Sequence, residues 1–86
     1  MPADMPKDNQ DRIVRMEQIL HSVSAELYKY CLLVGFDPET FDYKEYSERN
    51  LIGIEFNENN NFLKSYCEKI VTIEKILEEL NNKELP

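Results

Sequence analysis

The most constraining feature of this chain is an apolar periodicity between residues 12 and 35. Its apolar positions follow one another in steps of three and four over three heptads: Ile13, Met16, Leu20, Val23, Leu27, Tyr30 and Val34. Side chains at this spacing form one stripe along an α-helix. No proline or glycine interrupts the stripe before Gly35, a residue type common just beyond a helix C-terminus. The pattern therefore predicts a long amphipathic helix over about residues 10–34.

A second stripe lies near the other end of the sequence. Its apolar positions step by three and four in the same way: Leu63, Tyr66, Ile70, Ile73, Leu77 and Leu80. Asparagines precede the stripe, and an asparagine side chain can accept a hydrogen bond from the first turn of a helix. We therefore predict a second long helix over about residues 59–82. Two such stripes satisfy one another when the helices fold back antiparallel as a hairpin.

The connecting segment, residues 35–58, is predicted to be helical or irregular. Asp42 and Glu45 have the spacing of a capping box, which indicates a short helix over about residues 43–51, stopped by Gly53. The alternation of Ile52, Ile54 and Phe56 would also suit a short strand, which would have to pair across a dimer. Residues 1–9 contain two prolines and are expected to be a mobile, disordered leader to a single helical domain over residues 10–86.

Both stripes are wider than the seam of a two-stranded coiled coil. Ile19 and Leu33 widen the first stripe, Phe62 and Ile76 widen the second, and Leu32 lies near the back of the first helix. We predict that these five residues mediate self-association. One partner helix cannot cover so broad an apolar surface. The expected fold is therefore mostly α: an antiparallel hairpin of two long helices with a short helical or irregular middle segment, forming a four-helix-type homodimer.

The sequence offers little for catalysis or metal binding. A chain with two glycines cannot build a glycine-rich phosphate loop. Cys31 and Cys67 lie within the apolar stripes with no histidine nearby in the pattern, which favours free, unreactive core thiols over a disulfide. The single histidine has no Glu-x-x-His pair around it and no cysteine cluster to complete a zinc site. We predict no catalytic residues, no cofactor and no metal, and hence that the chain is not an enzyme.

Two phosphoryl-transfer families provide a third function to weigh. His21 could accept a phosphoryl group as in histidine phosphotransfer domains, but Ser24 and Ala25 stand where those domains typically carry lysine and glycine. The stretch SAEL, residues 24–27, is similar to the S-Q-E-L-D signature of small helical-hairpin aspartyl-phosphate phosphatases. Tyr28 replaces the aspartate of that signature. Such a helical hairpin is the second alternative among the functions considered.

The charge of the chain constrains its partners. Seventeen acidic and ten basic side chains give a formal net charge of −7. That sign argues against direct binding of nucleic acid and against an anionic membrane surface, since both need a basic footprint. The chain also lacks the ~20 consecutive apolar residues of a membrane span, and its N-terminus lacks the apolar region of a secretory signal. We expect a cytoplasmic protein, or a nuclear one in a eukaryote.

The connecting segment combines acidic and aromatic side chains. Tyr43 and Tyr46, with acidic neighbours, are interpreted as an exposed pair. The predicted partner-binding residues are Phe41, Asp42, Tyr43, Glu45, Tyr46 and Glu48. The leading hypothesis is a non-catalytic protein–protein interaction module (adaptor, assembly subunit or inhibitor) whose acidic-aromatic surface meets a basic protein. The alternative is an acidic inhibitor of the phage or mobile-element type that mimics nucleic acid to block a nucleic-acid-binding protein.

Overall fold

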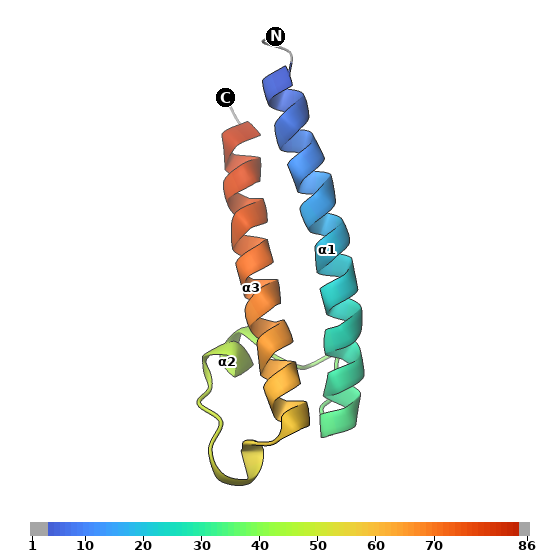
Figure 1. Ribbon diagram of the computed structural model, residues 1–86, viewed down its shortest axis with the longest axis vertical. Coiled ribbons are helices and arrows are strands. Elements are labelled where there is room, and N and C mark those ends of the chain that lie inside the picture. The colour runs from blue at the N-terminus through green and yellow to red at the C-terminus, as the bar shows by residue number, and fades with distance from the viewer. Residues whose placement is uncertain (1–3, 85–86) are drawn as a thin grey trace.

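Two long helices packed side by side form most of the molecule. The computed structural model describes residues 4–84, with side chains described over residues 9–82. Helix α1 spans Asp4–Val34, α2 spans Tyr43–Glu48, a 3-10 turn η1 spans Gly53–Glu55, and α3 spans Glu58–Glu84. Helices α1 and α3 run in opposite directions along the long axis, and α2 lies against α3 (Figure 1). The predicted mostly helical class and the packing of the two long helices are confirmed, and residues 4–84 contain no strand.

Helix α1 begins and ends for identifiable reasons. Its predicted end is confirmed: Gly35 has a φ of +103°, and the N–H groups of Gly35 and Phe36 both donate to the Cys31 carbonyl, at 2.9 and 2.8 Å. The helix starts at Asp4, so the backbone from residue 4 to residue 9 is helical where a disordered leader was predicted. Pro6 is compatible with this start because N–H groups in the first turn have no intrahelical partner. Residues 1–3 of the predicted leader lie outside the described part of the chain.

Side-chain caps define the other two helices. The Asp42 carboxylate accepts a hydrogen bond from the Glu45 N–H at 3.2 Å, as the capping-box spacing predicted. Helix α2 ends at Glu48, earlier than the predicted residue 51. The Asn57 side-chain oxygen accepts from the Asn60 N–H at 3.0 Å and begins α3. The strand considered for residues 52–56 does not form, because this stretch turns through η1.

The core lies at the end of the molecule where α2 packs against α3. Cys31, Leu63 and Cys67 are fully buried, and Tyr46 and Leu51 join them. The heptad residues of α1 are half-buried, whereas four of the six on α3 are buried: Leu63, Ile70, Ile73 and Leu80. At the end of the molecule that holds the core, α3 packs against both α1 and α2, while α1 packs mainly against α3.

The two cysteines are free thiols in this core. Burial raises the pKa of the Cys31 thiol and raises the pKa of Cys67 to about 12. Because the thiolate is the reactive form, both cysteines are poor nucleophiles in the folded state. They serve as small apolar side chains between α1 and α3.

Candidate functional site

The aromatic residues predicted to bind a partner turn inward instead. Tyr46 is only 3% exposed, and its hydroxyl donates to the Asn60 side-chain oxygen at 2.6 Å. The half-buried Tyr43 donates to the two carboxylate oxygens of Glu74 at 2.6 and 2.8 Å. The interpretation of Tyr43 and Tyr46 as an exposed pair is therefore wrong. Tyrosine suits this place because its ring covers apolar surface while its hydroxyl reaches a polar group on α3.

These hydrogen bonds also change the acidity of the two phenols. The hydrogen bond to Glu74, followed by burial, raises the pKa of Tyr43 to about 12. Burial is the main cause that raises the pKa of Tyr46. Both hydroxyls thus remain protonated donors at neutral pH, and the two tyrosines fasten α2 to α3. Their role in the structure is to position the acidic segment.

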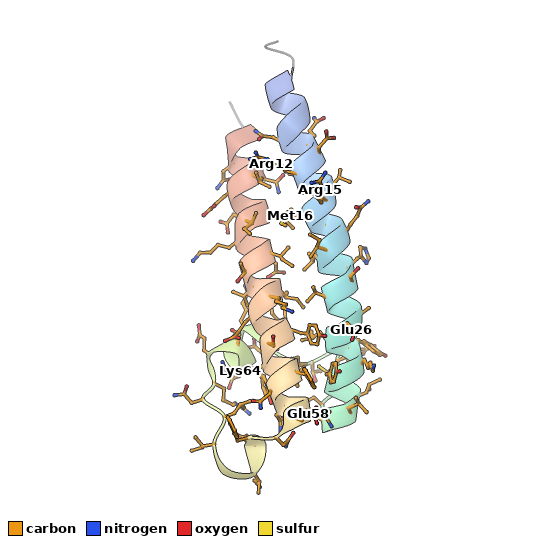
Figure 2. The ribbon with its side chains drawn as sticks, viewed as in Figure 1. Arg12, Arg15, Met16, Glu26, Glu58 and Lys64 are labelled. Atoms are coloured by element: carbon orange, nitrogen blue, oxygen red, sulfur yellow. The ribbon has the colours of Figure 1, made fainter. Side chains whose placement is uncertain are left out.

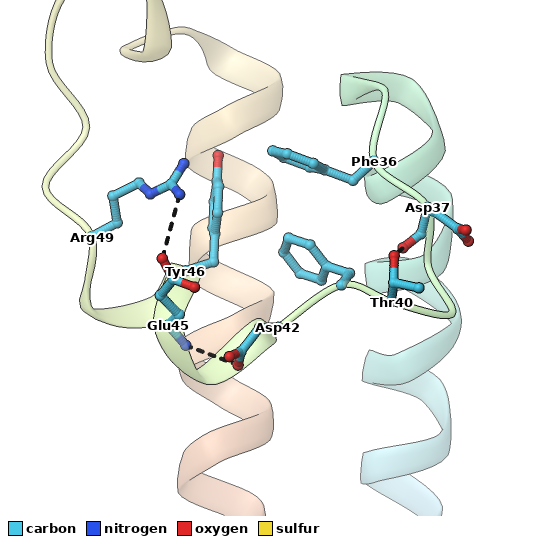
Figure 3. A pocket seen from close by; sticks show the side chains of 8 residues that line it. Phe36, Asp37, Thr40, Asp42, Glu45, Tyr46 and Arg49 are labelled. Atoms are coloured by element: carbon cyan, nitrogen blue, oxygen red, sulfur yellow. Dashed lines mark hydrogen bonds and ion pairs between the residues drawn. The ribbon is translucent and has the colours of Figure 1, made fainter.

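The carboxylates of the predicted site do face solvent. Asp42, Glu45 and Glu48 are exposed, while Phe41 is half-buried. A hollow of about 230 Å³ opens beside α2 (Figure 3). Its lining residues are Phe36, Asp37, Thr40, Phe41, Asp42, Glu45, Tyr46 and Arg49. The hollow has an aromatic floor and a mostly acidic rim, which is the charge pattern of a surface that attracts cations.

Arg49 is the basic residue of this hollow, and its charge is already engaged. Its guanidinium lies 5.1 Å from the centre of the Tyr46 ring. One of its nitrogens is 3.8 Å from a Glu45 carboxylate oxygen, and another is 3.3 Å from Glu55 (Figure 3 draws the Glu45 pair). The arginine therefore ties α2 to the turn η1 and leaves the surface acidic.

Most of the net charge of the chain is concentrated in this part of the sequence. Residues 37–58 carry seven carboxylates against two basic side chains, which is five of the seven net negative charges. The two long helices are close to neutral by comparison. Long-range attraction of a charged partner would therefore be directed at the connecting segment.

The loop that follows α2 exposes three large apolar side chains within five residues. Ile52 is 75% exposed, Ile54 is 96% exposed and Phe56 is 65% exposed. We call these three residues the apolar tip. The turn that presents them is held by backbone bonds from Glu55 to Ile52 and from Phe56 to Gly53, at 3.2 and 3.1 Å. Sequence reasoning did not assign this site, although the alternation of apolar residues with no predicted partner strand was its signal.

Four of the five residues predicted to mediate self-association gather on one face. In the heptad defined by Ile13 and Met16 as positions a and d, Ile19 and Leu33 occupy position g of α1, and Phe62 and Ile76 occupy position g of α3. Tyr30 bridges the helices there, with its ring 5.4 Å from Phe62. The four side chains are between 37% and 57% exposed. We call this g-position surface the open face.

Leu32 does not belong to the open face. It is 56% exposed but occupies position f, on the side of α1 directed away from α3. Toward the chain termini, the open face continues as an apolar hollow of about 230 Å³ lined by Arg12, Arg15, Met16, Ile76 and Leu80. Figure 2 shows Arg12, Arg15 and Met16 at this end of α1, with Glu26 nearer the core.

A further hollow of about 410 Å³ separates α1 from the connecting segment, but its chemistry is limited. Its lining residues are Leu20, Ser24, Leu27, Tyr28, Pro38, Glu39, Phe41, Tyr43, Ile70 and Glu74. Among them there is no histidine, cysteine, lysine or arginine to act with the Ser24 hydroxyl, and Glu74 is occupied by Tyr43. The exposed His21 lies outside this lining.

No family model, curated protein or solved structure matches this chain. Within the described residues, no three side chains of histidine, cysteine, aspartate or glutamate come together as a metal site. The same part of the molecule has no helix of the length and apolar character that a membrane crossing requires. The features of the described residues that bear on function are the exposed apolar tip, the acidic connecting segment and the open face.

Proposed function

We propose that this chain is a non-catalytic protein–protein interaction module that binds a basic protein through its apolar tip and the carboxylates around it. The observation that carries the proposal is the exposure of Ile52, Ile54 and Phe56. Full burial of an isoleucine or phenylalanine side chain is favourable by about 1.5–3 kcal/mol. Three such side chains held in water by a short turn contribute little to this fold, but they could anchor a complex.

The carboxylates of the segment would determine which partner is chosen. Asp42, which caps α2, and Glu45 and Glu48 on α2 are exposed, and they lie close in sequence to the tip. Charges at the rim of an interface accelerate association and disfavour partners of the same sign. A basic protein with an apolar groove fits both features. The chain would act on it as an adaptor, an assembly subunit or an inhibitor, according to what the bound surface normally contacts.

The proposal includes self-association as a four-helix-type homodimer. The four exposed apolar residues of the open face support it, because a helix pair with apolar g positions exposes more surface than one partner helix covers. A dimer would present two apolar tips and two acidic segments. Simultaneous engagement of two sites on one partner assembly would increase the overall affinity without any new contact.

The alternative function is an inhibitor that mimics nucleic acid. It is favoured by the concentration of five net negative charges within residues 37–58. In that case the carboxylates would occupy phosphate sites of a nucleic-acid-binding protein. Binding would weaken steeply with salt, and the apolar tip would contribute little.

The test is affinity capture from the native host with three variants of the chain. Ile54→Ser removes the most exposed side chain of the apolar tip, and Val14→Ser, at a 52% exposed position on α1, is the matched control. We expect a basic protein to be retained by the unmodified chain and by Val14→Ser, and to be lost with Ile54→Ser. Retention by Ile54→Ser would contradict the proposal.

The third variant separates the two functions. Glu45→Gln with Glu48→Gln removes two carboxylates and leaves the apolar tip in place. For the interaction module, this variant should slow association while moderate salt leaves most binding intact. For the nucleic-acid mimic, this variant should abolish binding. Binding of the unmodified chain should then weaken steeply with salt, and nucleic acid should displace the chain from its partner.

A further inference from the structure

The two long helices carry matching series on the open face. On α1, position g is occupied by Ile19, Glu26 and Leu33, and on α3 by Phe62, Lys69 and Ile76, each seven residues apart. Seven residues are about two helical turns, so each series follows one side of its helix. Both series have the same order of chemistry: apolar, charged, apolar. Charges are the usual occupants of position g in a coiled-coil pair, whereas helices that face a bundle core add apolar residues there.

The antiparallel packing within the chain places these series at the same levels. The Tyr30 ring lies 5.4 Å from Phe62 and 5.5 Å from Tyr66, and Met16 shares a hollow with Ile76 and Leu80. With this register, Ile19 is level with Ile76, Glu26 with Lys69, and Leu33 with Phe62. The open face thus consists of two apolar layers with a charged layer between them.

The opposite edge of the helix pair is already closed. Position e of α3 is occupied by Asn60, Cys67 and Glu74, and these residues are covered by the α2 segment through Tyr46 and Tyr43. Among the residues that the structure describes, no segment covers position g in this way. Helix α2 therefore leaves one of the two edges for an external partner.

We infer that a second copy of this chain covers the open face, with a two-fold axis parallel to the helices. Each α1 then lies antiparallel to α3 of the partner subunit. Ile19 and Leu33 meet the partner's Ile76 and the partner's Phe62, and Glu26 meets Lys69 of the partner subunit. This inference rests on the self-association in the proposed function and is independent of the basic protein partner.

The charges of Glu26 and Lys69 favour the two-fold axis parallel to the helices over a two-fold axis perpendicular to them. A two-fold axis perpendicular to the helices can also superpose the apolar layers, but only with the charged layer at its centre. Glu26 would then face Glu26 of the partner subunit, and Lys69 would face Lys69 of the partner subunit. Like charges placed together at an interface are unfavourable, whereas the parallel axis brings opposite charges together on both sides.

Disulfide trapping between two single variants tests the orientation. Chains with Glu26→Cys and chains with Lys69→Cys are refolded together, oxidised mildly and separated by mass. We expect a covalent dimer that contains one chain of each kind, and no covalent dimer from either variant alone. Glu26→Cys mixed with Glu68→Cys, at an exposed position f, is the matched control and should give no covalent dimer. The unmodified chain controls for its own buried thiols.

The charged layer is tested by reversal, with solution mass as the measurement. Glu26→Lys should weaken the dimer by about twofold to thirtyfold, because two partly exposed ion pairs are lost per dimer, and Glu26→Lys with Lys69→Glu should restore it. A molar mass that stays near 10.2 kDa at every concentration would overturn the inference and the self-association within the proposed function. A dimer in which Glu26→Cys cross-links with itself would overturn the orientation alone. The effect of Ile54→Ser on partner capture is read separately and leaves these outcomes distinguishable.

Discussion

The Tyr46 hydroxyl donates a 2.6 Å hydrogen bond to the side-chain oxygen of Asn60, and both residues are buried. This bond joins α2 to the first turn of α3. The centre of the Tyr46 ring also lies 5.7 Å from the centre of the Phe36 ring and 5.4 Å from that of Phe41. Tyr46 therefore connects α2 with the segment that follows α1. A helix of six residues is not stable alone. The place of α2, and of the carboxylates that it carries, therefore depends on this tyrosine.

Tyr46→Phe should destabilise the fold by about 1–3 kcal/mol, because the Asn60 oxygen would stay buried without its donor. The free energy of unfolding, measured in urea, is the readout. Tyr28→Phe removes a hydroxyl from a 56% exposed ring and is the matched control, with an expected change within about 0.5 kcal/mol. Equal effects of the two substitutions would show that the bond to Asn60 contributes nothing measurable.

Asn57→Ala should cost about 1 kcal/mol, because the Asn57 side chain accepts from the Asn60 N–H and so caps α3. The same side chain donates to the Ile54 carbonyl at 3.1 Å, so the substitution should also loosen the turn that presents the apolar tip. Thermal unfolding measures the first effect and amide hydrogen exchange around Ile54 measures the second. Asn59→Ala, in the exposed first turn of α3, should leave the stability unchanged. A loss of stability equal to that of Asn57→Ala would show that Asn57 is not the capping residue.

Gly35→Ala should be more costly than Gly53→Ala, although a Cβ would meet no atom within 4 Å at either position. The difference is one of backbone conformation. A φ of +62° at Gly53 lies in the small left-handed region that other residues can enter, whereas a φ of +103° at Gly35 lies beyond it. We expect a loss of about 1–2 kcal/mol for Gly35→Ala and less for Gly53→Ala, both by urea unfolding. The reverse order would indicate that α1 can end without this conformation.

The helical elements could be predicted from the sequence because their signals are local. Apolar steps of three and four gave both long helices, and Gly35, Asp42 and the asparagines before α3 marked helix ends by their backbone and capping preferences. The early start of α1 was not predicted, because the two prolines in residues 1–9 indicated a segment without helix. Pro6 is tolerated there, since it lies in the first turn.

The candidate site was less predictable because it depends on tertiary contacts. Acidic neighbours made Tyr46 look exposed, but its burial depends on Asn60, fourteen residues away, and on the ring of Phe36. The apolar tip was hidden for a related reason. The alternation at Ile52, Ile54 and Phe56 resembles a strand. Residues 4–84 contain no strand with which it could pair, and these three side chains are exposed to water.

The stability of the fold should decrease at alkaline pH because the Cys67 thiol and the Tyr43 hydroxyl would lose protons that the folded state holds tightly. The pKa of Cys67 is raised from 9.0 to about 12 by burial, and the pKa of Tyr43 is raised from 10.0 to about 12 by its bond to Glu74. A raised pKa means that the folded state binds the proton more tightly than the unfolded state does. The resulting stabilisation is complete at neutral pH and declines as the pH rises from about 9 to 12. Midpoints of urea unfolding across this range, in the presence of reductant, measure the decline. Tyr43→Phe should reduce the slope of the midpoint against pH above pH 10, and Tyr28→Phe should leave that slope unchanged. A midpoint of the unmodified chain that does not fall by pH 11 would contradict the prediction.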